Sequence, residues 1–500
     1  MTGRTFAEDL RAAAVRHPER EAIVARDRTV SYGDLDRLAD GLATKLRASG
    51  VDRGDRVAVV LPNGVEAAIA IYGVLRAGAA FSPLNPTIKR EKLAHVLADS
   101  GAAAVICDAG RAEVVSEATA IAGEIPIITD VESQARDGAS APSPPVSVDL
   151  AAVIYTSGST GDPKGVTLTH GNMTFAADSI IEYLRMDESD RVLCVLPLSF
   201  DYGLYQLLMT VRVGATLVLE NGFAFPGRVV QLLEAERITG LPGVPTVFHV
   251  LLSLRGLAER DLPELRYLTN TGAALHAPTV EAIRRTFPNA RLYSMYGLTE
   301  CKRVAYLPPE QVEKRATSVG IPIPGTEVWI EDEDGHVLGP NEVGELMIRG
   351  AHVMQGYWND PEMTAKRLRP GRWPWERVLA SGDLFRADEE GYLYFVGRRD
   401  DLIKSGGEKV VPREIEDVLH SAPGVREAAV VGVADRLLGQ AVHGHVSAQP
   451  GAVLDVAALR IFCSERLEDY KVPRHLTVHD ELPRTSNGKI DKSALGGRPV

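Results

Sequence analysis

The sequence predicts an α/β protein with a large N-terminal domain of mostly parallel sheets and a small α+β domain at its C-terminus. Three observations predict this fold class. The chain has 500 residues, which is more than one compact core usually holds. Short β-branched runs alternate with alanine-rich amphipathic stretches between about residues 50 and 220, and such alternation is typical of parallel βαβ units. A charged turn then ends a strand-like run near residue 397.

The strands predicted in the first domain are short apolar runs, several of which are followed by Gly, Pro or Asn. They cover residues 57–61, 103–107, 125–128, 152–155 and 192–196. The longer apolar segment at residues 67–81 is interrupted by Tyr72, Arg76 and two glycines, so we expect a buried helix that leads into a strand. No segment reaches the roughly 20 apolar residues of a membrane-spanning helix.

The predicted domain boundary lies in the charged turn at residues 397–401. Beyond it we expect a helix over 412–419, strands over 428–433 and 442–447, and a helix over 456–467. The first domain therefore covers residues 1–399 and the second covers residues 400–500.

Composition excludes several classes of protein. Hydrophobic residues make up 45% and charged residues 24% of the chain, which argues against a fibrous or disordered protein. The formal charge of −12 is spread along the sequence without a basic stripe, so nucleic acid is not an expected partner. Cys107, Cys194, Cys301 and Cys463 are far apart and form no CxxC pair. We expect free thiols in a reducing cytoplasm, because residues 1–10 also lack the apolar run of a signal peptide.

A glycine-rich loop at residues 155–165 is the strongest functional signal. It places three glycines, four Ser or Thr residues and one lysine directly after a strand. Glycines let backbone N–H groups approach anionic oxygens, and hydroxyls and the lysine add hydrogen bonds and charge. The candidate ligands of a polyphosphate are Thr156, Ser157, Gly158, Ser159, Thr160, Gly161 and Lys164. Because Lys164 is followed by Gly165, the loop is not a Walker A motif. The alternative is a flexible surface turn.

The loop resembles the signature loop of the adenylate-forming superfamily at eleven ordered positions. That superfamily includes acyl-CoA synthetases, adenylation domains and beetle luciferase. The resemblance implies an enzyme that uses ATP and Mg²⁺ to activate a carboxylic acid as an acyl-AMP. It also implies an N-terminal domain of several subdomains and a mobile C-terminal domain. Residues 344–346 and 356–358 also fit family patterns.

Further motifs follow the loop in the order that the family has them. Residues 296–300 read YGLTE, and the resemblance implies that Tyr296 and Gly297 contact adenine, Thr299 contacts the α-phosphate and Glu300 holds Mg²⁺. The alternative is a strand-end turn with a solvated glutamate. By the same resemblance, the small residues Gly272, Ala273 and Ala274 border the adenine, and Asp383 and Arg398 contact the ribose.

The C-terminal segment 483–491 resembles the family's PRTxxGKI motif, and the resemblance makes Lys489 the best candidate for the catalytic lysine of adenylate formation. Without the motif, a solvated lysine would be the default interpretation. The resemblance also places a hinge at Asp400 and a loop that faces the thiol in the second half-reaction at Lys404, Gly406 and Gly407.

The acyl pocket is less defined. Asp201 directly follows Phe200, as in adenylation domains in which this aspartate binds a substrate ammonium. An aspartate with a purely structural, hydrogen-bonded role is an equally favoured interpretation. Lys302 and Arg303 follow Glu300, and either can contact a second polar group of the substrate or face solvent. By rough alignment the remaining pocket candidates are Tyr205, Phe248, Thr269, Thr271 and Met295.

The predicted function is ATP-dependent activation of a small carboxylic acid and transfer of its acyl group to the pantetheine thiol of CoA. The alternative is a stand-alone adenylation enzyme that activates an amine-bearing acid and loads the phosphopantetheine of an acyl or peptidyl carrier protein. Less favoured are a non-thiol acceptor and a non-catalytic nucleotide-binding protein, since Lys489, Glu300 and Asp383 are all present.

Overall fold

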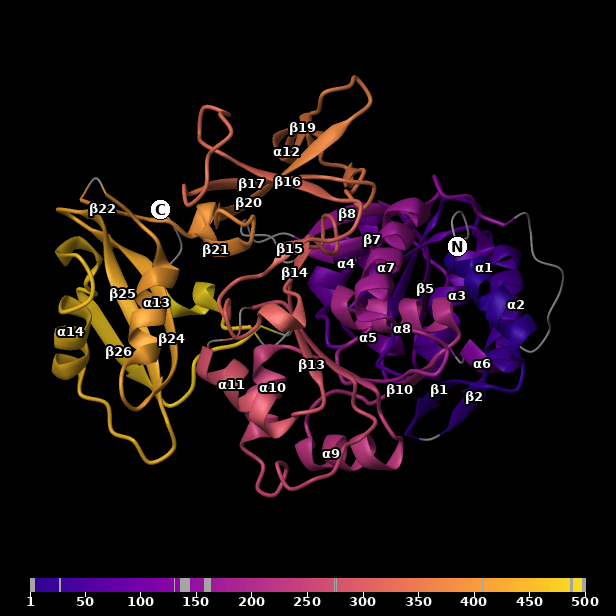
Figure 1. Ribbon diagram of the computed structural model, residues 1–500. Helices are drawn as coiled ribbons and strands as arrows, with labels where there is room; N and C mark the ends of the chain where they lie inside the picture. The colour runs from indigo at the N-terminus through magenta and orange to yellow at the C-terminus, as the bar shows by residue number, and fades with distance from the viewer. Residues whose placement is uncertain are drawn as a thin grey trace. The chain divides into compact units, whose positions relative to one another are not determined.

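A computed structural model describes residues 5–26, 28–129, 131–134, 144–156, 163–273, 275, 277–406, 408–485 and 489–496. The chain forms two compact units, each described here by itself (Figure 1). The first contains Met1–Glu327 and Ile348–Leu379, and the second contains Val328–Met347 and Ala380–Val500. This division differs from the boundary expected between residues 399 and 400, which stays a proposal about where the domains part.

The first unit contains a sheet with the strand order β15-β14-β13-β12-β11-β9-β10-β1-β2. Its central pairs are parallel, and only the ends, where β2, β14 and β15 lie, are antiparallel. The strands are β1 (Glu21–Ala25), β2 (Thr29–Ser31), β9 (Arg191–Cys194), β10 (Thr216–Leu219), β11 (Gly240–Gly243), β12 (Tyr267–Asn270), β13 (Arg291–Tyr296), β14 (Ala305–Tyr306) and β15 (Ile321–Pro322).

A second sheet of this unit has the order β18-β8-β7-β4-β3-β5-β6. Strand β3 carries an almost continuous buried apolar run, as expected for a strand covered on both faces. The pairs from β7 to β6 are parallel, whereas β8 is antiparallel to both β7 and β18. The strands are β3 (Arg56–Val60), β4 (Ala80–Pro83), β5 (Ala102–Cys107), β6 (Ile127–Ile128), β7 (Leu150–Thr156), β8 (Lys164–Thr169) and β18 (Gly356–Tyr357).

The helices of the first unit connect these strands. Helix α3 is apolar on nearly all sides and buried, and it leads into β4 as the sequence predicts. Thr169 and Asn172 form a capping box at the start of α7, which fixes its entry from β8. The helices are α1 (Phe6–Arg16), α2 (Tyr32–Ala48), α3 (Val65–Ala77), α4 (Arg90–Ser100), α5 (Ala112–Ala122), α6 (Val131–Gln134), α7 (His170–Leu184), α8 (Asp201–Val213), α9 (Pro226–Ala235), α10 (Pro245–Leu252), α11 (Ala277–Thr286), α12 (Pro361–Arg367) and the 3₁₀ turn η1 (Pro309–Gln311).

A third sheet has the order β16-β17-β20-β19, with β21 paired to β20. Its strands are β16 (Glu327–Glu331), β17 (Gly344–Arg349), β19 (Leu368–Pro370), β20 (Arg377–Ala387) and β21 (Leu393–Arg398). The β20–β21 pair is antiparallel and sets Asp383 opposite Arg398.

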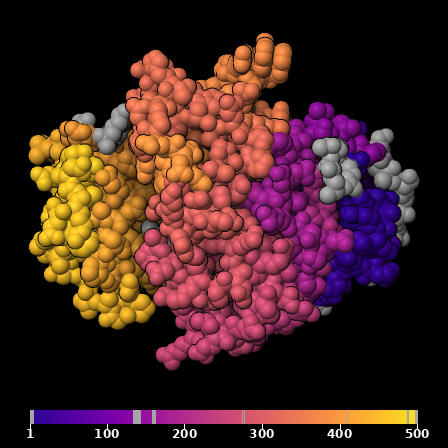
Figure 2. Space-filling model, viewed as in Figure 1, coloured from indigo at the N-terminus to yellow at the C-terminus, as the bar shows by residue number. Residues whose placement is uncertain are grey.

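The C-terminal part of the second unit is an α+β fold, as predicted. Its sheet has the order β23-β22-β25-β24, with β26 parallel to β25. Its atoms, in yellow and gold, form one compact body in Figure 2, and its core includes Ile415, Val430 and Leu459. The elements are η2 (Arg399–Asp401), β22 (Ile403–Ser405), β23 (Glu408–Val410), α13 (Pro412–Ser421), β24 (Val425–Asp435), β25 (Gly439–Ala448), α14 (Val456–Ser464), η3 (Asp469–Lys471), β26 (His475–His479) and η4 (Lys492–Leu495).

The structure confirms the α/β class and the mostly parallel sheets of the N-terminal part. All four cysteines are buried free thiols, as predicted. Within the described residues, every helix is too short or too polar to cross a bilayer.

One buried histidine ties the stability of the first unit to pH. His352 is 1% exposed and stacks on Phe175, with ring centroids 5.5 Å apart. Neither ring nitrogen has a hydrogen-bond partner among the described residues. Burial lowers the pKa of His352 from 6.5 to about 4, because no partner stabilises the charged form.

We expect the His352→Gln variant to lose less stability in acid than the parent chain. The pKa is lower in the folded state, so below pH 6.5 the unfolded state binds the proton first and stability falls as the pH falls towards 4. By pH 5 this histidine costs about 2 kcal/mol. Urea unfolding at pH 7.5 and pH 5 measures the difference. The exposed His336→Gln serves as a control, and equal acid sensitivity of the parent and His352→Gln would contradict the assignment.

Candidate active site

The phosphate-loop candidate is the connection of a β-hairpin. Thr156 ends β7 and Lys164 begins β8, and the two residues pair directly. Strand β7 also pairs with β4 inside the second sheet, so the hairpin is anchored in a buried scaffold. Ser157, Gly158, Ser159, Thr160 and Gly161 lie outside the described residues.

Close packing behind the hairpin explains why position 165 is a glycine. Its carbonyl accepts a hydrogen bond from the backbone N–H of Trp358 at 2.7 Å. A Cβ at Gly165 would lie 2.8 Å from Val153 Cγ1 and 3.2 Å from Trp358 Cβ. Any larger residue would push these side chains apart. Because it has no side chain, the loop's last glycine allows close packing between β8 and the segment that contains β18.

A tight turn follows β13 and carries the YGLTE residues. It folds back on itself, with the Val304 N–H donating to the Tyr296 carbonyl at 2.9 Å. Gly297 lies so close to the returning chain that a Cβ would be 2.1 Å from the Lys302 carbonyl oxygen. Lys302 adopts a left-handed backbone conformation, φ 61°, which non-glycine residues rarely adopt. Thr299 and Glu300 are half-buried at the tip.

Glu300 is held from two sides by the chain next to β18. Its backbone carbonyl accepts from the Met354 N–H at 2.8 Å, and its Oε1 accepts from the Tyr357 hydroxyl at 2.6 Å. Tyr357 pairs with Val166 on β8. The proposed metal ligand and the phosphate-loop hairpin are therefore connected through one strand. Sequence reasoning assigned no role to Tyr357, because only the strand pairing reveals its partner.

The adenine-turn candidates follow β12, the parallel neighbour of β13. Gly272 has a positive φ of 86°, and Asn270 Nδ2 donates to the Ala273 carbonyl at 2.9 Å. Tyr296 ends the adjacent strand. The two predicted adenine-contact segments thus leave neighbouring strands at their carboxyl ends, where ligands bind in open parallel sheets. Ala274 lies outside the described residues.

Several of the acyl-pocket candidates lie around two buried cations, Lys302 and Arg303. Lys302 is 5% and Arg303 1% exposed. Lys302 Nζ lies 3.7 Å from Asp201 Oδ2 and over the ring of Tyr205, 4.5 Å from its centroid. Burial lowers the pKa of Lys302 from 10.5 to about 7, although Asp201 acts in the opposite direction. The chain itself therefore supplies the ammonium beside Asp201.

Arg303 connects the pocket to the adenine turn. Its Nη1 donates to Thr271 Oγ1 at 2.7 Å, and its guanidinium lies 5.6 Å from the ring centroid of Tyr202. Its Nε is buried without a hydrogen-bond partner among the described residues. A buried donor without a partner is costly, so this nitrogen is a candidate ligand contact.

Both cations line a small cavity between α7, α8 and the ends of β12 and β13. Of the predicted pocket residues, Tyr205, Thr269, Met295 and Arg303 line it. Asp201 and Thr271 contact Lys302 and Arg303, respectively, and Phe200 packs edge-on against Tyr202. Phe248 is buried against Gly243 instead and is not part of this lining.

In the second unit, the ribose candidates form one group. Arg398 Nε lies 3.3 Å from Asp383 Oδ1. Glu345 accepts from the Gly382 N–H at 2.9 Å and from Arg399 Nη1 at 3.1 Å. The glutamate thus fixes the backbone of β20 next to Asp383.

Lys489 is exposed on a short loop of the second unit. The loop closes where the Asp491 N–H donates to the Pro483 carbonyl at 2.8 Å. It is anchored to β24, because Arg484 Nη2 donates to Glu427 Oε1 at 2.5 Å and Ile490 packs on the cluster around Val431.

The hinge and thiol-loop candidates also lie in this unit. Asp400 is exposed in η2, and Lys404 is exposed on β22. The Gly406 N–H donates to the Leu438 carbonyl at 2.9 Å, whereas Gly407 lies outside the described residues.

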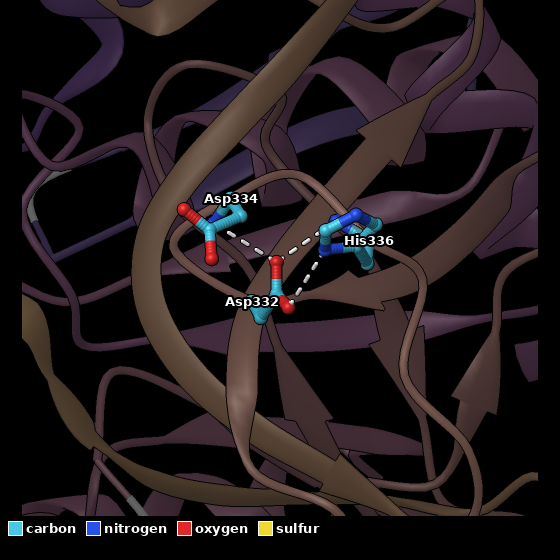
Figure 3. Close-up of side chains that lie close together, drawn as sticks. All are labelled: Asp332, Asp334 and His336. Atoms are coloured by element: carbon cyan, nitrogen blue, oxygen red, sulfur yellow. Dashed lines mark hydrogen bonds and ion pairs between the residues drawn. The ribbon is translucent and has the colours of Figure 1, made fainter.

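One further group of metal-ligand side chains lies in the loop after β16 (Figure 3). Asp332 Oδ1 accepts from the backbone N–H groups of Asp334 and His336 at 2.9 and 2.8 Å, and Oδ2 lies 3.2 Å from His336 Nδ1. Because the Asp332 carboxylate is occupied in shaping the turn, we assign the group a structural role.

The chain is similar to known proteins over nearly its whole length. Residues 10–358 match the family model "AMP-binding enzyme" and residues 414–489 match "AMP-binding enzyme C-terminal domain". The chain is 36% identical to a feruloyl-CoA synthase of Amycolatopsis over 97% of this chain and 96% of that protein. It is 32% identical to a linear gramicidin synthase of Brevibacillus parabrevis, over 96% of this chain but 6% of that protein. A crystal structure of ATP-bound MatB from Rhodopseudomonas palustris superimposes with a TM-score of 0.90, 28% identity and 98% coverage of both chains.

We expect the stability cost of Asp201→Asn to depend on pH. At pH 6 Lys302 is protonated and loses its carboxylate partner, which costs about 1–3 kcal/mol. At pH 9, above the folded-state pKa of about 7, Lys302 is neutral and the substitution costs little. Urea unfolding at both pH values measures this difference. In a Lys302→Met background the same substitution should show no such pH dependence, and an equal cost at pH 6 and pH 9 in the parent would contradict the pairing.

Proposed function

Because this chain belongs to the AMP-binding enzyme family, we propose that it activates a small carboxylic acid with ATP and transfers the acyl group to the thiol of CoA. The observation that supports this best is the connection from the phosphate-loop hairpin to Glu300. Lys164 begins β8, β8 pairs with β18, and Tyr357 of β18 holds Glu300. Candidate ligands for phosphate and for a cation thus share one scaffold.

In the first half-reaction a carboxylate oxygen of the acid attacks the α-phosphorus of ATP, and the bond to the leaving pyrophosphate breaks. Negative charge must be stabilised on both sides of that phosphorus. Thr156 and Lys164 would bind the phosphates, and Thr299 would contact the α-phosphate. Gly272, Ala273, Tyr296 and Gly297 would hold the adenine, while Asp383 and Arg398 would bind the ribose.

Glu300 fits a Mg²⁺ ligand. Mg²⁺ prefers hard oxygen ligands and few protein contacts, and the hydrogen bond from Tyr357 at 2.6 Å orients the carboxylate. When bound, Mg²⁺ would neutralise charge on the phosphates. Tyr357 would act as a positioning residue, because outer-shell partners fix the ligand that they contact.

Lys489 would stabilise the charge that develops during adenylate formation. We expect Lys489→Ala to slow formation of acyl-AMP on the order of a hundredfold or more, while attack of a thiol on preformed acyl-AMP stays largely intact. Single-turnover assays of each half-reaction measure the two effects. Lys492→Ala is the matched control, because its ammonium is bound to Glu416 at 2.7 Å. Equal losses in both half-reactions would contradict the assigned role of Lys489.

In the second half-reaction the CoA thiol, losing its proton to solvent, attacks the acyl carbon, and the bond to AMP breaks. We propose that the domains part at residues 399 and 400, that Asp400 is the hinge, and that Lys404, Gly406 and Gly407 face the thiol in this step.

A second candidate is an adenylation enzyme that loads a carrier protein, and the similarity to the linear gramicidin synthase favours it. The contact between Lys302 and Asp201 weighs against an amine-bearing substrate, because Asp201 already has a cationic partner. ATP–pyrophosphate exchange over aliphatic, aryl and amino acids, followed by addition of CoA or a holo carrier protein, separates the candidates. We expect exchange with acids that lack an amine and thioester formation with CoA. Thioester formation only on the carrier would overturn the choice of CoA.

A further inference from the structure

The charge balance around the cavity is incomplete. Lys302 and Arg303 are both buried, and Asp201 is the one carboxylate in an ion pair with either of them within the described part of the chain. The other neighbours of Lys302 are aromatic rings, which attract a cation but do not neutralise it. Two buried cations therefore share one negative charge.

Two other buried cations in this chain, Arg76 and Arg212, are each paired with two carboxylates. Arg76 contacts the carboxylates of both Asp36 and Asp40. Arg212 contacts those of both Asp9 and Asp178. Buried charges need such partners because desolvation otherwise makes them costly. Compared with Arg76 and Arg212, the Lys302–Arg303 pair lacks a negatively charged partner.

The geometry indicates where the anion would bind. Lys302 and Arg303 line the same small cavity, and the buried Nε of Arg303 has no partner among the described residues. Arg303 also reaches Thr271, which follows β12 beside the proposed adenine turn. The cavity thus has an ammonium and a guanidinium in its lining, among the predicted acyl-pocket residues Tyr205, Thr269 and Met295.

We propose that the acid carries a second carboxylate at its far end and that this carboxylate binds between Lys302 and Arg303. The inference rests on the proposed function, since it names the substrate class of the same site. The bound anion would balance the second cation, so the group would be neutral overall. A substrate with an uncharged tail would leave the charge uncompensated and would be discriminated against.

The test is ATP–pyrophosphate exchange with malonate, succinate, glutarate and adipate, each compared with its half-amide. The half-amide keeps the size and the reacting carboxyl but lacks the second charge. We expect the best dicarboxylate to exceed its half-amide by about a hundredfold in kcat/KM. Lys302→Met should reduce this preference to about one, and Lys302→Arg, which keeps the positive charge, should restore most of it.

The outcomes separate this inference from the function on which it rests. Equal use of dicarboxylates and half-amides, exchange with monocarboxylates alone, or an unchanged preference in Lys302→Met would overturn the inference and leave the acid-activating function in place. No exchange with any aliphatic, aryl, amino or dicarboxylic acid would remove the proposed function and this inference with it.

Discussion

The candidate site depends on one turn, from Tyr296 to Val304, in which the Val304 N–H donates to the Tyr296 carbonyl at 2.9 Å. The turn is possible only because Gly297 lacks a Cβ where the returning chain approaches it. It brings Glu300 to Tyr357 of β18, which pairs with β8 of the phosphate-loop hairpin, and it buries Lys302 and Arg303 in the lining of the small cavity. A few residues thus link the proposed metal ligand to the residues that we propose contact the substrate.

The turn also explains why the cavity contains features that are unfavourable for the free energy of folding. Lys302 has a left-handed backbone conformation and a desolvated ammonium, and both are unfavourable for folding. Such features persist where the surrounding structure enforces them and are frequent at functional sites. A binding partner that compensated the charge would gain affinity from it, because the protein has already desolvated the cation.

Much of the fold followed from the sequence, because continuous apolar runs such as Val57–Val60 and the apolar helix before Ala80 are characteristic of buried parallel sheets. The order of the motifs predicts which residues would act on ATP, and their roles stay a proposal. The sequence could not reveal that Tyr357 contacts Glu300, since the two residues are distant in the chain and meet only through strand pairing. Nor could it show whether Lys302 faces solvent, because burial of a turn residue depends on α7 and α8 packing over it. The division into compact units also departs from a cut at one position, because residues 328–347 join the C-terminal unit through sheet pairing.

The central claim is that the acid's carboxylate attacks the α-phosphorus of ATP. The most direct measurement uses an acid that supports turnover, labelled with ¹⁸O in its carboxylate, and mass spectrometry of the nucleotide product. Attack at the α-phosphorus predicts AMP that carries one ¹⁸O from the acid, together with unlabelled pyrophosphate. Formation of ADP with ¹⁸O in inorganic phosphate would show attack at the γ-phosphorus and would contradict the account.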